Sequence, residues 1–249
     1  MTGTDPARLP PPPALRDAAL FLDVDGTLVE FAPTPDAVAV APGLVDRIER
    51  LRAKHGAVAF VSGRPIAQID SLFVPLRLPA AGIHGLERRR ADGTVLRNDP
   101  SGTLASLKAP LAGLAETHEG VLLEDKGLTL AVHYRLAPDR GPFVREAVAA
   151  LVAPLAAELR VLDGNMVVEI KPRNADKGKA VAAFMTETPF AGRTAFYFGD
   201  DVTDEDAFAA VNALDGVSVL VGPPRPTAAR WRLDSVAAVH DWIAAQQGG

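Results

Sequence analysis

Apolar residues occur along the chain in short continuous runs that alternate with amphipathic stretches. The runs "AALFL" from residue 18, "AVAFV" from residue 57 and "TAFYF" from residue 194 are apolar on both strand parities. Strands that helices cover on both faces have this character. The stretches "GLVDRIERLRAKHG" and "IAQIDSLF" have helical spacing, the first ending at Gly56. This βαβ order predicts an α/β fold with a Rossmann-like parallel sheet.

The pattern changes between about residues 89 and 172. In "GLTLAVHYRL" one parity carries Leu128, Leu130, Val132 and Tyr134, and the other Thr129, His133 and Arg135. "RVLDGNMVVEIKP" predicts a hairpin or a strand, with an Asp163-Gly164 turn, and "PFVREAVAALVAPLAAEL" predicts a helix. Strands with one polar face are typical of antiparallel sheets. A small α+β module inserted into the parallel core is therefore expected.

Three divisions of the chain follow from these patterns. Residues 18–98 and 173–249 are expected to form the core, and residues 99–172 the inserted module. The core order resumes with helices at "DKGKAVAAFMTE", "TDEDAFAAVNAL" and "SVAAVHDWIAAQ" and strands at "TAFYFGDD" and "VSVLVG". Residues 1–17 contain four consecutive prolines, Pro10–Pro13, and predict a disordered, solvated arm.

Composition narrows the classes of function. A net charge of −5 argues against binding to nucleic acid or an anionic membrane, and no apolar run is long enough to cross a bilayer. The arginines 88–90 are interpreted as a solvated edge. The absence of cysteine excludes disulfides and thiolate chemistry, and the first residues lack the apolar segment of a signal peptide. A cytoplasmic monomer acting on a small molecule is expected.

Polar clusters directly follow the predicted strands. "DVDGT" follows the first strand, "SGR" the second and "GDDVTDED" a late one, while Lys177 opens a helix. Ligands of an open parallel sheet bind beyond the carboxyl ends of its strands. Asp23, Asp200 and Asp201 would repel one another there unless a cation lay among them. Carboxylate oxygens favour Mg²⁺, which in turn prefers a phosphate as partner.

The remaining groups suit phosphoryl transfer. Ser62, Lys177 and the N–H groups after Asp25 would hold phosphate oxygens. Because the chain turns at Gly26, Asp23 and Asp25 can take different roles, one as nucleophile and the other as proton carrier. Each motif alone also has an ordinary interpretation as a turn, a helix cap or a solvated lysine. Four such coincidences are less probable than one site.

These motifs resemble those of the haloacid-dehalogenase superfamily of phosphatases, in the same order. The resemblance implies that Asp23 is the nucleophile and a Mg²⁺ ligand. It implies that Asp25 is the general acid and base and ligates Mg²⁺ through its carbonyl oxygen, which disfavours dehalogenation. The implied roles of the others are metal ligation for Asp200, support of the metal site for Asp201 and Asp204, and phosphate binding for Ser62 and Lys177.

A more specific resemblance involves the insertion, which is similar to the α/β cap of sugar-phosphate members. "VSGR", "GIHGLE", "LEDKGLTLAVHYR", "VVEIKP" and "GDDVTDEDAF" together resemble the trehalose-6-phosphate phosphatases. The resemblance implies sugar binding by Arg64, His84 and Glu87 in the core and by Glu124, Lys126, His133, Arg135 and Glu169 in the cap. Surface ion pairing is the alternative for the cap residues.

The implied activity is Mg²⁺-dependent hydrolysis of trehalose 6-phosphate through an aspartyl-phosphate. Three alternatives stay open from the sequence. The substrate could be another sugar phosphate, such as sucrose phosphate or a glucosyl- or mannosylglycerate phosphate. The chain could be a phosphomutase that returns the phosphoryl group to a sugar. It could also be a non-catalytic sugar-phosphate-binding protein with a relic site.

Overall fold

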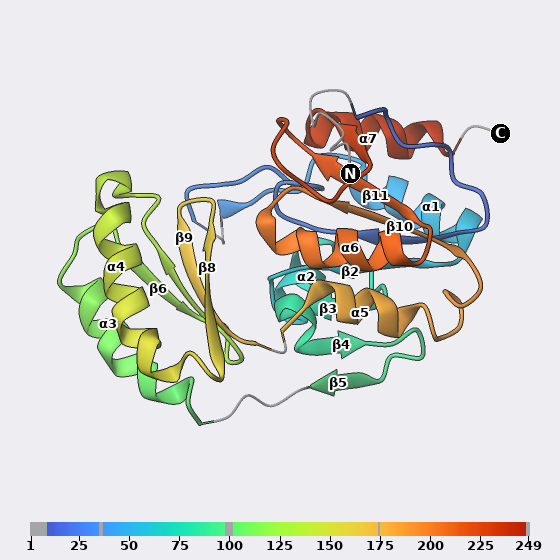
Figure 1. Cartoon of the computed structure of the whole chain (residues 1–249). Coiled ribbons are helices and arrows are strands. Elements are labelled where there is room, and N and C mark those ends of the chain that lie inside the picture. The colour runs from blue at the N-terminus through green and yellow to red at the C-terminus, as the bar shows by residue number, and fades with distance from the viewer. Residues whose placement is uncertain (1–8, 35–36, 98–101, 174, 248–249) are drawn as a thin grey trace. The chain divides into compact units, whose positions relative to one another are not determined.

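The computed structural model describes residues 9–34, 37–97, 102–173 and 175–247 (Figure 1). The chain forms two compact units. The first comprises the described residues of Met1–Ala32, Val38–Leu96 and Asp176–Gly249, and the second those of Pro33–Ala37 and Arg97–Ala175. None of the helices in the described part of the chain combines the length and hydropathy that a membrane span requires.

An eight-stranded sheet forms the centre of the first unit, in the order β12-β11-β10-β1-β2-β3-β4-β5. Its strands are β1 (Ala18–Leu22), β2 (Val58–Val61), β3 (Ala80–Gly82), β4 (Glu87–Arg89), β5 (Val95–Arg97), β10 (Thr194–Gly199), β11 (Val217–Val221) and β12 (Trp231–Leu233). Pairing is parallel from β12 to β3, and β4 is antiparallel to β3. The chain thus leaves β1 in two directions, which places a switch point between β1 and β10.

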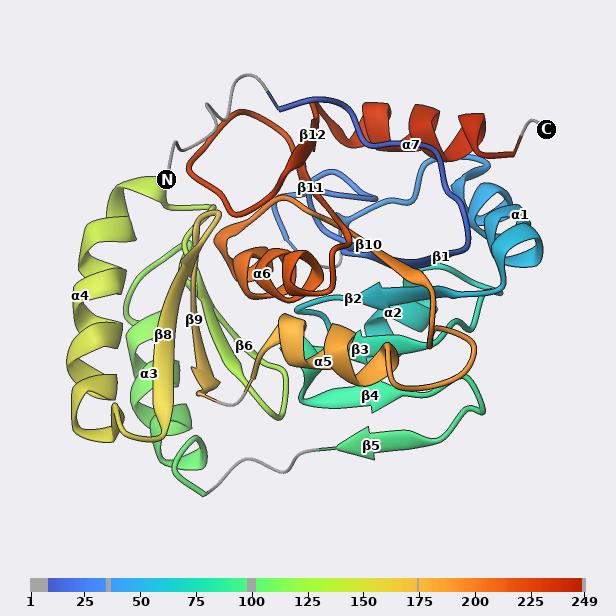
Figure 2. The ribbon, with the colours of Figure 1, turned by 45° about the vertical axis from the view of Figure 1, so that its right-hand side comes forward.

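Helices cover both faces of this sheet (Figure 2). The helices α1 (Leu44–His55), α2 (Ile66–Leu72) and α7 (Val236–Ala245) share one apolar core, and α5 (Lys177–Phe184) and α6 (Glu205–Ala213) share the other. In β1, Leu20 belongs to the first core and Phe21 to the second. The prediction that these strands are buried on both faces is confirmed. Gly56 ends α1 as expected, with a φ of 76° that favours glycine.

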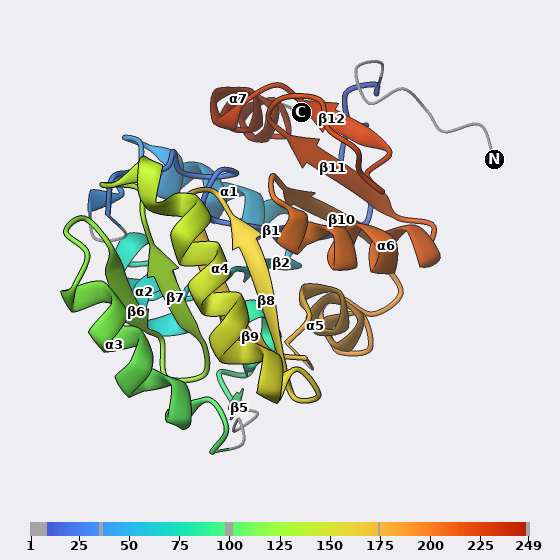
Figure 3. The ribbon, with the colours of Figure 1, turned by 60° about the vertical axis from the view of Figure 1, so that its left-hand side comes forward.

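The second unit contains a four-stranded antiparallel sheet in the order β6-β7-β9-β8, with α3 and α4 on one face (Figure 3). Its elements are α3 (Lys108–Glu116), β6 (Leu122–Asp125), β7 (Leu130–His133), α4 (Gly141–Val152), β8 (Leu159–Gly164) and β9 (Val167–Pro172). Val132 and Val168 pair across β7 and β9 and pack in the core beneath the helices. The opposite face of the sheet carries the alternate positions, as the sequence pattern predicted.

The hairpin β8–β9 turns later than expected. Gly164 pairs with Val167, so Asn165 and Met166 form the turn, and Met166 has a φ of 57°. The predicted Asp163-Gly164 turn is therefore wrong, although Asp-Gly is a strong local turn signal. Register is decided instead by the alternation that directs Val168 into the core, because a shift by one residue would reverse every side chain of β9.

Part of the expected N-terminal arm is packed on the first unit. Residues 1–8 lie outside the described residues. Leu15 is only 9% exposed and belongs to the core, and its N–H donates to Oε1 of Gln246 at 3.0 Å. The carbonyl oxygen of Pro10 accepts a hydrogen bond from the N–H of Arg232 in the edge strand β12. Residues 9–17 thus do not match the expected solvated arm, because an apolar anchor and an unpaired strand edge hold them.

The arginines 88–90 form ion pairs rather than the solvated edge that was expected. Arg88 and Arg90 donate to Glu187 at 2.8–3.0 Å, and Arg89 donates to both carboxylate oxygens of Asp70 at 2.7 Å. Hydrogen bonds from Arg88 and Arg90 lower the pKa of Glu187 to about 2. Alternation along β4 sends these arginines to opposite faces of the sheet, where acidic partners distant in sequence lie.

Glu187→Gln is expected to lower the free energy of unfolding at pH 7 by about 1 kcal/mol, because two guanidinium groups lose their ionised partner. The ionised Glu187 stabilises the fold above the ordinary glutamate pKa of 4.5, and this stabilisation is lost as the pH falls toward 2. The difference in stability between variant and parent should therefore narrow in acid. Urea unfolding at several pH values measures it, with the exposed Glu116→Gln as control. Equal stability of variant and parent at pH 7 would contradict the assignment.

Candidate active site

The polar clusters that follow β1 and β10 lie beside each other at the carboxyl edge of the sheet. Leu22 and Phe198 are register partners in these strands, and the N–H of Asp23 donates to the carbonyl oxygen of Phe198 at 3.0 Å. Asp200 directly follows β10, and Ser62 directly follows the neighbouring β2. These residues therefore lie at the switch point, where parallel α/β sheets bind ligands.

Lys177 links two carboxylates inside the protein. As the first residue of α5 it is 2% exposed, and its Nζ donates to Oδ1 of Asp23 at 2.9 Å and to Oδ1 of Asp204 at 2.7 Å. Burial alone would lower the pKa of Lys177, but the two carboxylates outweigh it and raise that pKa. The side chain is therefore a permanent ammonium group at neutral pH.

The two partners of Lys177 differ in their electrostatics. Burial raises the pKa of Asp23 in spite of the ammonium group. Burial also acts to raise the pKa of Asp204, but Lys177 and hydrogen bonds outweigh it and the net shift is downward. One ammonium cannot compensate two buried carboxylates, so Asp204 is stabilised as an anion and the ionised form of Asp23 is disfavoured unless a further cation binds.

Asp204 has all of its acceptor positions in use. Oδ1 accepts from Lys177 and from the hydroxyl of Tyr197 at 2.6 Å, and Oδ2 accepts from the N–H groups of Asp200 and Asp201 at 3.0 Å. A carboxylate offers about four such positions. Asp204 therefore orients the Asp200–Asp201 backbone and the lysine, and it would lose a hydrogen bond by binding a cation.

Asp23 and Asp200 are better suited to hold a metal. Together with Asp204 they each offer an oxygen within 4.8 Å of the others. Within the described part of the chain, the carboxylate of Asp200 accepts no hydrogen bond, and burial and the neighbouring carboxylates raise its pKa. The Asp201 carboxylate instead accepts from the N–H of Val202 at 2.7 Å. An uncompensated pair of hard oxygen donors fits a divalent cation such as Mg²⁺.

Gly26 allows the DVDGT turn to approach Asp200. Its φ is 75°, and a Cβ atom built there would lie 2.2 Å from Oδ2 of Asp200. The N–H of Gly26 donates to the carbonyl oxygen of Val29 at 2.8 Å, which closes the turn. Any side chain at this position would clash with the carboxylate, so glycine is required sterically as well as conformationally.

Asp25 is bound by Arg64, a residue expected to contact the sugar. The guanidinium donates from Nε and Nη2 to the two carboxylate oxygens, both at 2.7 Å. The N–H of Arg64 also donates to Oγ of Ser62 at 3.1 Å. Arg64 thus connects two predicted catalytic groups, and a bidentate pair of this kind fixes the direction of the carboxylate.

His84 lies in the short segment between β3 and β4, and Glu87 is the first residue of β4. Ile83 and His84 have φ values of 48° and 53°, uncommon for residues other than glycine. The His84 ring lies against Gly63, where an added Cβ would be 3.0 Å from its Nε2. Such strained backbone is often found at functional sites. Glu87 is buried, and its Oε1 accepts from the N–H of Ile66, the first residue of α2.

Four of the predicted cap residues form one cluster on the sheet face of the second unit opposite α3 and α4. Oε2 of Glu124 accepts from Nε2 of His133 at 2.9 Å, and Nζ of Lys126 lies 3.3 Å from Oε1 of Glu169 and 3.9 Å from Oε2 of Glu124. The cluster consists of Glu124, Lys126, His133 and Glu169. Arg135 donates to the carbonyl oxygen of Asn165 at 2.8 Å.

Three residues of these sites were not predicted. Thr129 donates to Oε1 of Glu169 at 3.3 Å, Tyr197 binds Asp204, and Arg225 donates to the carbonyl oxygens of Asp200 and Asp201. A tyrosine in a strand buried on both faces is a signal, because its hydroxyl needs a partner. Arg225 lies in the loop "GPPRPT", which has no pattern that indicates its contacts.

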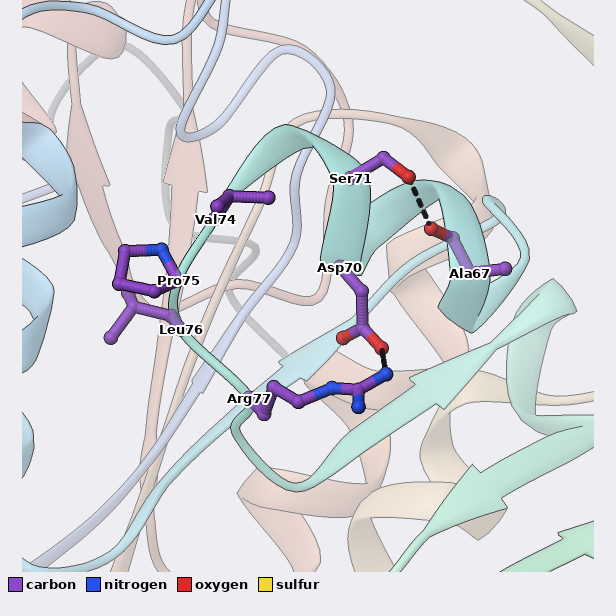
Figure 4. Close-up of a pocket in the computed structure, with 7 residues that line it drawn as sticks. All are labelled: Ala67, Asp70, Ser71, Val74, Pro75, Leu76 and Arg77. Carbon is purple, nitrogen blue, oxygen red and sulfur yellow. Dashed lines mark hydrogen bonds and ion pairs between the residues drawn. The ribbon is translucent and has the colours of Figure 1, made fainter.

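A separate pocket of about 410 Å³ lies at the end of α2 (Figure 4). Its lining residues are Ala67, Asp70, Ser71, Val74, Pro75, Leu76 and Arg77. The charged groups Asp70 and Arg77 pair with each other at 3.0 Å, and Ser71 donates to the carbonyl oxygen of Ala67 at 2.9 Å. Polar groups satisfied in this way offer little to a ligand, and the lining includes none of the predicted site residues.

Comparison with known sequences connects this geometry to one group of proteins. The profile of the trehalose-phosphatase family matches residues 21–237. The chain is 46% identical to a probable trehalose-phosphate phosphatase of Sinorhizobium fredii over 91% of its length and 86% of the relative's. It is 41% identical to the trehalose-6-phosphate phosphatase of Escherichia coli, with 90% of this chain and 85% of that protein covered.

Solved structures agree on the fold. The C-terminal domain of the Candida albicans trehalose-6-phosphate phosphatase matches with a TM-score of 0.85 at 21% identity, covering 97% of this chain and 99% of that one. A haloacid dehalogenase-like hydrolase from Bacteroides thetaiotaomicron matches with a TM-score of 0.66 at 14% identity, covering 91% and 98%. The predicted fold class, a haloacid-dehalogenase-like parallel core with an inserted α+β module, is confirmed.

Proposed function

Because this chain belongs to the trehalose-phosphatase family, we propose that it hydrolyses trehalose 6-phosphate to trehalose and inorganic phosphate with Mg²⁺ as cofactor. The observation that carries the proposal is how the two carboxylate oxygens of Asp23 are held. Its Oδ1 is held by the buried ammonium of Lys177, and within the described residues its Oδ2 accepts no hydrogen bond. A carboxylate held in this way is oriented and has an oxygen available to attack phosphorus.

Asp23 and Asp25 divide the chemistry in this proposal. Oδ2 of Asp23 attacks phosphorus, the bond from phosphorus to the sugar oxygen breaks, and Asp25 donates a proton to that oxygen as trehalose leaves. Asp25 then takes a proton from water, whose oxygen attacks the aspartyl-phosphate, so that phosphate leaves and Asp23 is restored. The bidentate contact with Arg64 fixes the direction of the Asp25 carboxylate, and the N–H of Arg64 also binds Oγ of Ser62.

Positive charge and hydrogen-bond donors are needed around the transferred phosphoryl group. Ser62 and Lys177 are assigned to its oxygens, because a hydroxyl and a buried ammonium are fixed donors that need no reorganisation. Mg²⁺, when bound, neutralises charge on the phosphate. Asp23, the Asp25 carbonyl and Asp200 would hold the ion. Asp201 and Asp204 would support it from the second coordination sphere, as the hydrogen bonds of Asp204 to the Asp200 and Asp201 N–H groups favour.

The second unit is assigned to recognition of the sugar. We assign the predicted insertion, residues 99–172, as a cap domain whose cluster Glu124, Lys126, His133 and Glu169 hydrogen-bonds to sugar hydroxyls, joined by Arg135. In the core, Arg64, His84 and Glu87 are assigned to the sugar side of the site. Neighbouring charged groups that donate and accept hydrogen bonds suit vicinal hydroxyls, which themselves both donate and accept.

Phosphate release should be measured for the full chain with trehalose 6-phosphate, sucrose 6-phosphate and glucose 6-phosphate. We expect a strong preference for the first, complete loss of activity in EDTA, and recovery on addition of Mg²⁺. Equal rates on all three would reject the substrate assignment. Full activity in EDTA would reject the cofactor assignment.

Glu169→Gln is expected to raise KM for trehalose 6-phosphate by about tenfold with a smaller change in kcat, because it removes a charged acceptor from sugar binding and leaves the reacting groups intact. The exposed Glu146→Gln on α4 is the matched control. Steady-state kinetics of both variants test the assignment. A Glu169→Gln variant with parental KM would instead support an ion pair of purely structural importance.

The wider setting of the chain is also a proposal. We assign it to the cytoplasm, as a monomer with a small-molecule substrate and without a nucleic-acid or membrane partner. The absence of cysteine and the net charge of −5 support this assignment.

A further inference from the structure

Arg225 binds the backbone of the acidic loop that follows β10. It lies in the loop between β11 and β12, and its side chain is 23% exposed. Nε donates to the carbonyl oxygen of Asp200 at 3.1 Å, and Nη2 donates to that of Asp201 at 2.8 Å. Nη1 donates to Oε1 of Glu205 at 2.5 Å and to the carbonyl oxygen of Pro226 at 3.0 Å. One guanidinium thus joins two loops and the start of α6.

The two consecutive residues Asp200 and Asp201 are therefore held from two sides. Oδ2 of Asp204 accepts from both of their N–H groups, and Arg225 donates to both of their carbonyl oxygens. The Asp200 carboxylate packs against Gly26 but accepts no hydrogen bond among the described residues, so its direction depends on the backbone that carries it. Whatever holds that backbone also determines where the Asp200 carboxylate points.

We propose that Arg225 is a positioning residue for divalent-cation binding: it holds the Asp200–Asp201 backbone so that the Asp200 carboxylate is directed to the cation. This inference rests on the proposed function. Arg225 acts through the two carbonyl oxygens and does not itself contact the cation. A planar guanidinium suits the task, because its donors diverge in a fixed plane and can reach both carbonyls and Glu205 at once. A lysine ammonium could not hold all three.

The direction in which cation affinity changes when Arg225 is removed distinguishes a positioning role from a direct electrostatic effect. Electrostatics alone predicts that removing a positive group near a cation site strengthens cation binding. Positioning predicts the opposite, because the backbone of Asp200 is released. Glu205 already neutralises Arg225, and the other oxygen of Glu205 is bound to the N–H of Ala228 at 2.7 Å.

The test measures binding of Mn²⁺ alone to the metal-free full chain by electron paramagnetic resonance, which reports the remaining free Mn²⁺. Arg225→Met is expected to weaken binding by about tenfold, as is usual when an outer-shell partner is lost, and Arg225→Lys by about threefold. Arg232→Met is the matched control. It removes another guanidinium, one bound to the carbonyl of Gly222 and to Asp234, and it should change the affinity by less than about twofold.

Activity supplies the second measurement. The Mg²⁺ concentration for half-maximal phosphate release should rise in Arg225→Met by about the same tenfold factor, while kcat at saturating Mg²⁺ stays within about threefold of the parent. Melting of the metal-free proteins, followed by circular dichroism, identifies folded variants. Should Arg225→Met not fold, Arg225→Lys carries the test.

Parental or tighter Mn²⁺ binding by the folded Arg225 variants would overturn the inference and leave the proposed function intact. Equal weakening in Arg232→Met would also overturn it, because the effect would then not depend on the acidic loop. If the parent chain bound no Mn²⁺, both the proposed cofactor and this inference would be rejected.

Discussion

Asp23→Asn is expected to reduce the rate of phosphate release by about four orders of magnitude, a loss of the size found when an essential catalytic carboxylate is removed. An amide is a poor nucleophile and a weaker metal ligand than a carboxylate. The amide oxygen can still accept the hydrogen bond that Nζ of Lys177 donates at 2.9 Å, so the site should keep its local structure. Steady-state assays with enzyme in excess of any contaminating phosphatase measure the loss.

The same substitution should not destabilise the metal-free protein. Burial raises the pKa of Asp23 above its ordinary value of 3.8, so the folded state binds its proton more tightly than the unfolded state does. The carboxyl group therefore stabilises the fold most at low pH, and this contribution falls as the pH rises above 3.8. At pH 7 in EDTA, Asp23→Asn should melt at the parental temperature or above.

The exposed Asp46→Asn on α1 is the control for both measurements. Turnover of Asp23→Asn near the parental rate would remove Asp23 from the role of nucleophile. If Asp23→Asn is folded, has low activity and is as stable as the parent, the role of Asp23 is chemical and not structural. Functional sites often retain groups that are unfavourable for stability.

Lys177→Met is expected to lower the free energy of unfolding by about 3–5 kcal/mol and to reduce phosphate release by at least about a thousandfold. The lysine is 2% exposed and is the cation shared by Asp23 and Asp204. Its removal leaves both buried carboxylates without their ammonium partner. Urea unfolding and phosphate release measure the two effects.

Lys179→Met is the matched control, because this lysine lies two residues later in α5 with its side chain 68% exposed. The double variant Lys177→Met with Asp204→Asn should regain part of the stability, since one unpaired charge is removed, but none of the activity. Recovery of activity in the double variant would show that Lys177 serves folding alone.

Much of the first unit could be predicted because its signals are local. The run Ala18–Leu22 is apolar at every position, which is favourable only where both sheet faces are covered, and both are. Helix α1 ends at Gly56 because glycine readily adopts the φ of 76° found there. In such places propensity, hydrophobic pattern and tertiary structure favour the same outcome.

Predictions failed where a local signal competed with distant partners. Asp163-Gly164 has a turn sequence but continues β8, because the register with Val167 places the apolar side of β9 in the core. The local sequence around Arg88 is typical of a solvated surface residue. In the fold, however, Glu187, far along the chain, accepts a hydrogen bond from Arg88 at 2.9 Å. The burial of Leu15 likewise depends on core residues contributed by other segments.

For the site, sequence alone determined which residues converge, namely Asp23, Asp25, Ser62 and Asp200. Each follows a strand of a parallel sheet, and the carboxyl ends of such strands must meet at one edge. Only the tertiary structure decided how the charges are shared: that Lys177 joins Asp23 to Asp204, and that Arg64 and Arg225 hold the neighbouring groups. Those contacts depend on side-chain directions between residues far apart in sequence, which no local pattern encodes.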